Sequence, residues 1–209
     1  MHTLYWKPSS GSLAPMALLE ETGLPYSMVK VDADAGEHKS EAYKRDVHPL
    51  GLIPALKLRD GRVMIESAAI VAYLADLAPE RQLAPAPNSS DRAFYLQWLV
   101  YGAATLYPAY IRFYHPDYHR VREGDDEAVQ DLALTALNEA WKAVETAFAD
   151  GRPFLTGERC TAADVYIAML ALWHPDKKTF KPACPGVDRM QAAVWQRPAA
   201  AKALALHAR

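Results

Sequence analysis

The residues best suited to chemistry in this sequence form a loop rich in hydroxyl groups. Ser9, Ser10 and Ser12 surround Gly11, directly before a stretch whose pattern predicts a helix from Leu13. A thiolate held in this loop would meet the positive end of that helix together with hydroxyl or amide donors, and both favour the charged form of a thiol. The same serines could serve only as a polar turn and a helix cap, so the sequence leaves both interpretations open.

The sequence places no cysteine in this loop. Its two cysteines, Cys160 and Cys184, form no Cys-x-x-C pair. That count excludes a disulfide scaffold and a zinc site built from several cysteines. Neither cysteine has a neighbouring base in the sequence, so we interpret both as ordinary residues. Thiol chemistry in this protein would therefore use a thiol that another molecule brings.

A second candidate site is the pair Glu66-Ser67, which follows a strand pattern and precedes a helix pattern. Ser67 is expected to cap that helix, because serine is among the preferred N-cap residues. The unpaired N–H groups at a helix N-terminus attract anions. This pair could therefore bind a carboxylate as well as begin a helix.

The elements that must position these residues alternate between strand and helix over the first part of the chain. Strands are predicted at 3–6, 26–31, 54–58 and 63–65, and helices at 13–22 and 67–77, with an irregular helical stretch within 33–48. The pair Asp60-Gly61, between the last two strands, is typical of a β-hairpin. Gly23, followed by Pro25, is expected to end the first helix.

The remainder of the chain is predicted to be helical. Residues 79–90 contain three prolines and have the composition of a linker. Helices are predicted at 91–114, with a kink at Pro108, and at 123–149, 161–173 and within 186–209. Thr161 and Asp164 have the spacing of a capping box. The predicted fold class is therefore α/β plus all-α, with domains at 1–78 and 91–209 joined by the linker at 79–90.

The composition narrows the classes of function. Lys and Arg total 23 and Asp and Glu total 25, which gives a net charge of −2. A nucleic-acid-binding domain would normally carry a basic face, so no nucleic-acid partner is expected. No apolar run is long enough to span a membrane, and the first residues lack the features of a signal peptide, so we expect a cytoplasmic protein. His115 and His119 lack a supporting carboxylate motif, and no metal is expected.

Three motifs resemble those of the cytosolic glutathione S-transferases. Residues 5–15, Tyr-Trp-Lys-Pro-Ser-Ser-Gly-Ser-Leu-Ala-Pro, are similar to the opening of bacterial beta-class members. Residues 48–56, His-Pro-Leu-Gly-Leu-Ile-Pro-Ala-Leu, resemble the segment that holds the family's cis-proline, and residues 66–70 match its Glu-Ser-x-x-Ile. The resemblance covers nearly the whole chain, and it implies a thioredoxin-like N-terminal domain with a C-terminal helical bundle.

The resemblance also implies a function and a set of binding residues. It implies a transferase of detoxification, a homodimer that conjugates the thiolate of glutathione to small apolar electrophiles, with glutathione as co-substrate and no permanently bound cofactor. Ser67 would bind the α-carboxylate of glutathione, and Glu66 would help to hold its ammonium group. A cis bond before Pro54 would present the backbone of Ile53 to the cysteinyl residue. The other implied glutathione contacts are Gly11, His38 and Leu52, and Tyr107 and Tyr110 are expected to line the electrophile pocket.

The sequence departs from the beta-class pattern at the centre of the site. Gly11 stands at the position of the beta-class cysteine, so no mixed disulfide between glutathione and the protein can form there. Ser10 and Ser12 flank it and are the catalytic candidates. Tyr5, which matches the position of the tyrosine used by some animal classes, is the runner-up. Leu52 stands where a polar residue is common, which removes one side-chain contact to glutathione.

Two other functions fit the same sequence. The fold could serve as a glutathione-binding or protein-interaction module with little catalysis, an alternative that Gly11 and Leu52 motivate. It could also act as a glutathione-dependent disulfide reductase or peroxidase that uses two glutathione molecules and no protein cysteine. Retention on immobilised glutathione, combined with an aryl-halide conjugation assay, would separate binding from turnover.

Overall fold

The computed structural model describes residues 1–208 and begins with a small mixed sheet. Its strands are β1 (His2–Trp6), β2 (Tyr26–Lys30), β3 (Ala55–Lys57) and β4 (Val63–Met64), in the order β2-β1-β3-β4. β1 runs parallel to β2 and antiparallel to β3, and β3 continues through a hairpin into antiparallel β4. The four predicted strands and the hairpin are therefore confirmed, each close to its expected bounds.

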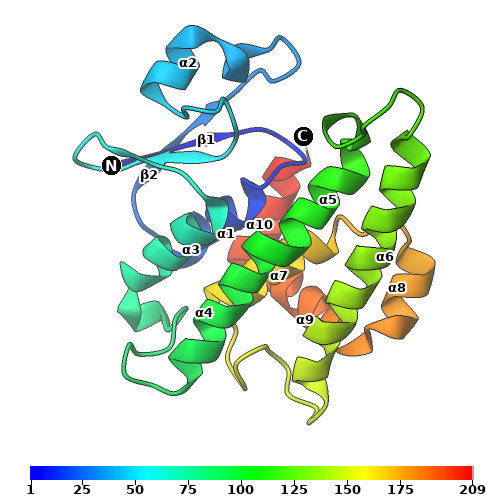
Figure 1. Ribbon diagram of the computed structural model, residues 1–209. Helices are drawn as coiled ribbons and strands as arrows, with labels where there is room; N and C mark the ends of the chain where they lie inside the picture. Colours follow the sequence, from blue (N-terminus) through cyan, green and yellow to red (C-terminus); the bar gives the residue numbers. More distant parts are fainter. Residues whose placement is uncertain (209) are drawn as a thin grey trace.

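Helices cover both faces of this sheet. They are α1 (Leu13–Thr22), the short 3-10 turn η1 (Glu37–Lys39), α2 (Glu41–Asp46) and α3 (Ser67–Asp76). α1 ends where Gly23 adopts a left-handed conformation with φ of 68°, which glycine reaches without steric cost. Leu4 and Trp6 point from β1 into the core that α1 and α3 share. α1 and α3 lie on the side of the sheet that faces the rest of the molecule, and α2 lies on the other side (Figure 1).

The rest of the described chain is helical. It comprises η2 (Pro79–Arg81), α4 (Asp91–Tyr101), η3 (Gly102–Leu106), α5 (Tyr107–Tyr114), η4 (Pro116–Tyr118), α6 (Asp126–Glu145), η5 (Thr146–Phe148), α7 (Ala162–Ala171), α8 (Lys177–Ala183), α9 (Pro185–Gln196) and α10 (Pro198–His207). All residues of α7 are buried, which agrees with a sequence that is apolar on every side. Its predicted capping box is confirmed, because Asp164 accepts hydrogen bonds from the backbone N–H and the hydroxyl of Thr161, each at 2.7 Å.

The structure divides the long helix predicted at 91–114. Between α4 and α5, η3 is a π-helical turn in which the backbone N–H of Tyr107 donates to the carbonyl of Gly102. This turn directly precedes Pro108, which cannot donate a hydrogen bond and disturbs the preceding turn of a regular helix. The kink expected at Pro108 therefore takes the form of a π-helical turn in front of it. α8 is absent from the prediction, since Pro182 interrupts its pattern.

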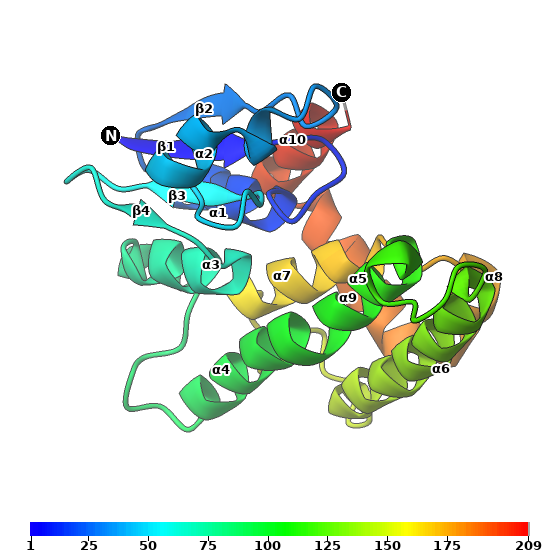
Figure 2. The ribbon, with the colours of Figure 1, turned by 45° about the horizontal axis from the view of Figure 1, so that its top comes forward.

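The last helix returns to the first and joins the two halves. α10, drawn in red, packs on α1, drawn in blue (Figures 1 and 2). Arg197 donates two hydrogen bonds to Glu21, both at 2.7 Å, and Lys202 reaches Glu20 at 2.8 Å. Buried residues of both halves form one hydrophobic core.

The predicted fold class, a small α/β part followed by an all-helical part, is confirmed. The domain bounds of 1–78, 79–90 and 91–209 stay a prediction, and Arg209 lies outside the described residues. Within residues 1–208 no helix has the length and apolar character needed to cross a membrane.

Candidate functional site

The loop between β1 and α1 is held together by its own serines. Ser10 and Ser12 each donate a hydrogen bond to the carbonyl of Lys7, at 2.8 and 3.0 Å, and their hydroxyl oxygens lie 2.7 Å apart. Ser9, which is exposed, takes a left-handed conformation with φ of 51°. Ser12 is fully buried and Ser10 is 8% exposed. The two predicted catalytic hydroxyls therefore lie together at the base of a compact loop.

A histidine from the other end of the chain supports this loop. The Nε2 atom of His207, in α10, lies 3.0 Å from the hydroxyl oxygen of Ser12. Burial, with a smaller contribution from the charge of Lys7, lowers the pKa of His207 to about 4, so the ring is neutral at neutral pH. The ring of Trp6 packs against it, with 6.0 Å between ring centres. Sequence reasoning missed His207, because no local signal marks a partner 195 positions away.

Gly11 lies against a tyrosine from the helical half. A Cβ atom on Gly11 would come within 2.7 Å of the hydroxyl oxygen of Tyr107, the first residue of α5. The ring of Tyr107 meets Trp173 edge-on, with 5.2 Å between ring centres. Burial, and to a smaller extent the charge of Glu66, raises the pKa of Tyr107 to about 12, although a contact with the Gly11 backbone opposes the shift. Tyr107 therefore keeps its proton at neutral pH.

The beginning of α3 lies beside this tyrosine and is strained. Glu66 has a φ of 69°, in a region that residues other than glycine rarely adopt, and such strain concentrates at functional sites. The prediction that Ser67 caps the helix is wrong. Glu66 occupies the cap position, and Ser67 is the first helical residue, with its hydroxyl oxygen 3.3 Å from that of Tyr166 in α7. The first N–H groups of α3 have no partner within the helix, as at any helix N-terminus.

The peptide bond between Ile53 and Pro54 is cis, as the resemblance implied. The backbone N–H and C=O of Ile53 make no hydrogen bond within the described part of the chain, so both can pair with an added extended chain. Leu52 is 48% exposed beside them. His48, in the same segment, is buried and accepts a hydrogen bond at Nδ1 from the backbone N–H of Leu50 at 3.2 Å. We therefore assign His48 to the support of this turn.

Cationic side chains lie near this turn. His38 is half-buried, and burial together with the charges of Lys39 and Lys7 lowers its pKa, so its ring is neutral at neutral pH. Lys39 donates a hydrogen bond to the carbonyl of Gly51 at 2.9 Å. The carboxylate contact expected of His38 stays a prediction, and the neighbouring positive charges belong to Lys7 and Lys39. Sequence reasoning missed both, because solvated lysines carry no distinguishing pattern.

The three predicted site tyrosines have different surroundings. Tyr5 extends from β1 and meets the ring of Tyr43 edge-on, with 6.2 Å between ring centres. Tyr110, which was expected in the electrophile pocket, is 1% exposed, and its hydroxyl accepts a hydrogen bond from the indole N–H of Trp141 at 2.9 Å. Tyr110 therefore belongs to the core of the helical half. Of the three, Tyr107 is the one that reaches the loop at Gly11.

Comparison with known proteins now places the chain among its relatives. Residues 9–77 match the family model described as the glutathione S-transferase N-terminal domain, and residues 98–197 match its C-terminal domain. The chain belongs to the glutathione S-transferase family. It is 32% identical over 170 residues to glutathione S-transferase GstA of Escherichia coli O157:H7, a match that covers 81% of each protein.

Solved structures of glutathione S-transferases agree with this assignment. A glutathione transferase homologue from Sulfitobacter, with bound glutathione, is 26% identical to this chain. It superposes with a TM-score of 0.87, and the match covers 97% of this chain and 96% of that one. The bacterial beta-class glutathione S-transferase of Sphingomonas chungbukensis is also 26% identical, with a TM-score of 0.82 over 98% of both chains. The resemblance to bacterial beta-class members is therefore confirmed.

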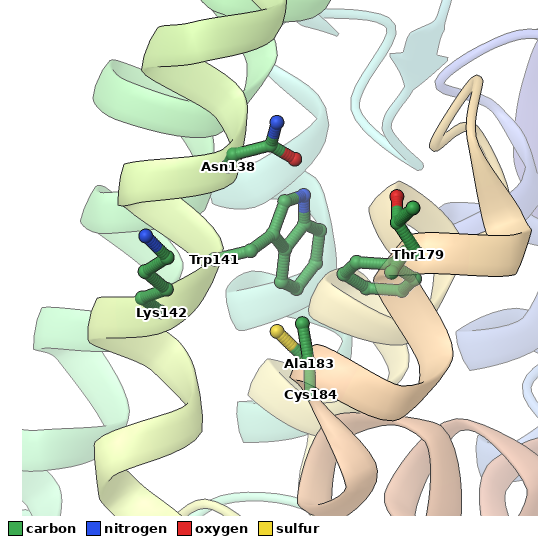
Figure 3. A pocket seen from close by; sticks show the side chains of 7 residues that line it. Asn138, Trp141, Lys142, Thr179, Ala183 and Cys184 are labelled. Carbon is green, nitrogen blue, oxygen red and sulfur yellow. The ribbon is translucent and has the colours of Figure 1, made fainter.

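Neither cysteine of this family member is prepared for reaction. Cys160 and Cys184 are both free and buried, and burial raises the pKa of each thiol, that of Cys184 to about 11. Cys184 borders a cavity of about 170 Å³ between α6 and α8, together with Trp141 and Lys142 (Figure 3). This cavity belongs to the helical half, away from the loop at 7–12. Thiol chemistry at the loop therefore needs a thiol from outside the chain.

Proposed function

We propose that this glutathione S-transferase binds glutathione between three segments of its N-terminal half and conjugates the thiolate to small apolar electrophiles. The observation that carries the proposal is the arrangement of the loop at 7–12, the backbone of Ile53 and the strained start of α3. Tyr107 links the first and the third of these, because it contacts Gly11 and because the charge of Glu66 contributes to its raised pKa. Each segment offers groups that suit one part of a peptide thiol.

The γ-glutamyl end of glutathione suits the start of α3. Its α-carboxylate would accept hydrogen bonds from the first N–H groups of the helix, where the helix dipole attracts an anion. The hydroxyl of Ser67 and the carboxylate of Glu66 would complete this end, Glu66 by pairing with the ammonium group. The cysteinyl residue would pair with the backbone of Ile53 as an added strand, beside Leu52. The glycyl carboxylate would then lie toward the charges of Lys7 and Lys39 and the neutral ring of His38.

The thiol of glutathione must lose its proton before it attacks an electrophile. We propose that Ser10 and Ser12 support the sulfur through the loop that they hold. Ser10 is the less buried of the two and is better placed to reach the sulfur directly. The thiol proton passes to water, and the thiolate forms a bond to carbon. In a substitution, the leaving group departs with its bonding electrons, so the reaction needs no metal and no permanently bound cofactor.

A homodimer is part of this proposal. α4 exposes large apolar side chains, with Phe94 at 54% and Val100 at 63%, and such surfaces are typical of interaction sites. Arg92 holds α4 against α3 through two hydrogen bonds to Asp76, both at 2.8 Å. Light scattering after gel filtration should give the mass of a dimer, and Phe94→Glu combined with Val100→Glu should give a monomer. Val121→Glu, on an exposed residue outside this surface, is the control.

Binding and turnover should be measured separately, the first by calorimetric titration with glutathione and the second with an aryl halide. We expect the unaltered protein to do both. Glu66→Gln should weaken glutathione binding by about tenfold, because it removes a hydrogen bond between charged groups. Glu80→Gln, on an exposed residue of η2, is the matched control. Binding without turnover would favour the interaction module, and the absence of binding would refute the proposal.

A further inference from the structure

The loop proposed to hold the sulfur of glutathione uses both of its buried hydroxyls in internal hydrogen bonds. The hydroxyls of Ser10 and Ser12 both donate to the carbonyl of Lys7. The backbone N–H of Ser12 donates to the hydroxyl oxygen of Ser10 at 3.3 Å. The N–H of Ala14, in the first turn of α1, donates to the sulfur of Met169 at 3.4 Å. A sulfur that enters this loop therefore finds both of its buried hydroxyls and these two N–H groups already paired.

The hydroxyl of Tyr107 differs from these donors. It lies 2.7 Å from the place where a side chain on Gly11 would begin, and it donates to no acceptor within residues 1–208. The edge-on contact with Trp173 holds the ring in place. Because the pKa of Tyr107 is raised to about 12, the phenol is protonated at neutral pH and can act as a donor. The hydroxyl thus occupies the volume that a larger residue would fill at position 11.

We propose that Tyr107 is a catalytic residue whose hydroxyl donates a hydrogen bond to the sulfur of bound glutathione and so stabilises the thiolate. The inference rests on the glutathione transferase function proposed above and deepens it. Tyr107 stays protonated throughout, the thiol proton passes to water, and the sulfur alone forms the new bond to the electrophile. Because Tyr107 belongs to α5, the helical half would take part in activating the thiol as well as in shaping what the thiol attacks.

The proposal also accounts for the glycine in the loop. A side chain at residue 11 would displace the Tyr107 hydroxyl, and Gly11 is the residue that leaves this space open. Where the beta-class pattern has a cysteine in the loop, the group that meets the sulfur would then come from α5. Ser12 is a poorer candidate, because its hydroxyl is fully buried and already bonded to Lys7 and His207.

The test is Tyr107→Phe, which keeps the ring and its contact with Trp173 and removes only the hydroxyl. The pKa of the bound glutathione thiol, followed by the ultraviolet absorbance of the thiolate, should rise by about one unit, because one hydrogen bond to a charged group is lost. At a pH below that pKa, the conjugation rate at saturating glutathione should fall about tenfold, while glutathione affinity changes little. Tyr101→Phe is the matched control, since its hydroxyl donates to the carbonyl of Ala140 at 3.0 Å, away from the loop.

The possible results separate this inference from the proposed function. An unchanged thiol pKa in Tyr107→Phe, with glutathione still bound, would overturn the inference and leave the proposed function intact. A rise in Tyr5→Phe or Ser10→Ala without a rise in Tyr107→Phe would also overturn it and would assign the donor to that residue. If the unaltered protein binds no glutathione, the proposed function fails, and this inference fails with it.

Discussion

The contact between Gly11 and Tyr107 can be measured as a coupling between two substitutions. Gly11→Ala adds a Cβ atom that would lie 2.7 Å from the Tyr107 hydroxyl oxygen, a separation that real Cβ atoms essentially never show. Gly11 is not among the residues with positive φ, so alanine carries no backbone strain there. Tyr107→Phe removes the hydroxyl, and the nearest remaining ring atoms, Cε2 and Cζ, are 3.3 and 3.4 Å from the Cβ position.

Two effects of Gly11→Ala oppose each other. Overpacking a tightly filled place typically costs about 1–3 kcal/mol. Replacing glycine by alanine also restricts the unfolded chain, which stabilises the folded state by about 0.4–1 kcal/mol. We therefore expect Gly11→Ala to lower the free energy of unfolding by about 1–2 kcal/mol in the unaltered protein. In the Tyr107→Phe background the loss should be smaller by about 1 kcal/mol, because the closest atom is gone.

The assay is urea unfolding of the four proteins in the cycle, followed by circular dichroism and tryptophan fluorescence. In thermal unfolding of the same proteins, a coupling of about 1 kcal/mol would correspond to a difference in Tm of about 2–4 °C for a chain of this size. Gly11→Ala combined with Tyr101→Phe is the control, and its effects should add. If the effects of Gly11→Ala and Tyr107→Phe also add, within about 0.5 kcal/mol, the hydroxyl does not occupy the space at Gly11, and the physical basis of the inferred donor is refuted.

Three further predictions concern the loop and the helical half. Ser10→Ala should lower the conjugation rate more than Ser12→Ala does. Ser12→Ala should instead lower Tm by about 2–4 °C, because buried hydrogen bonds are lost. Unchanged conjugation rates in both variants would rule out the serine assignment. Burial holds the pKa of His207 at about 4, so as the pH falls the unfolded chain binds the proton before the folded protein does. The free energy of unfolding should therefore fall by up to about 3 kcal/mol as the pH decreases from about 6.5 to about 4. His207→Gln should lack that part of the pH dependence in urea titrations, and identical profiles would contradict the argument. Asp164→Ala removes a fully buried carboxylate that accepts three hydrogen bonds at the start of α7. It should lower the free energy of unfolding in urea by about 3 kcal/mol. The control Asp150→Ala, at an exposed residue, should lower it by less than about 1 kcal/mol.

The elements of this protein follow from signals that lie within a few residues of each other. Gly23 marks the end of α1, and Asp60-Gly61 marks the hairpin between β3 and β4. Thr161 and Asp164 mark the start of α7, and the structure has the capping box that their spacing predicts. Each of these signals acts through the conformation or the hydrogen bonds of its own segment, which is why the sequence alone was sufficient for it.

Packing changed some of these local outcomes. Ser67 has the residue type of a helix cap, yet its hydroxyl lies beside Tyr166, because α7 packs against the start of α3. The helix predicted at 91–114 contains a π-helical turn at Gly102–Leu106, where a Cβ on Gly102 would come within 2.8 Å of the Tyr166 ring. At Ser67 a contact with a distant helix replaced the cap that the residue type favours, and at Gly102 such a contact accompanies the turn in front of Pro108.

The site residues show the same division. The sequence by itself identified Gly11, Ile53-Pro54 and Glu66 as the positions of interest, and it predicted that any reactive thiol would come from another molecule. Only the fold revealed that Tyr107 fills the space at Gly11 and that His207, 195 positions away, is bonded to Ser12. Backbone preferences act over a few residues, whereas contacts between elements depend on how entire apolar faces pack together, and no single segment of the chain contains that information.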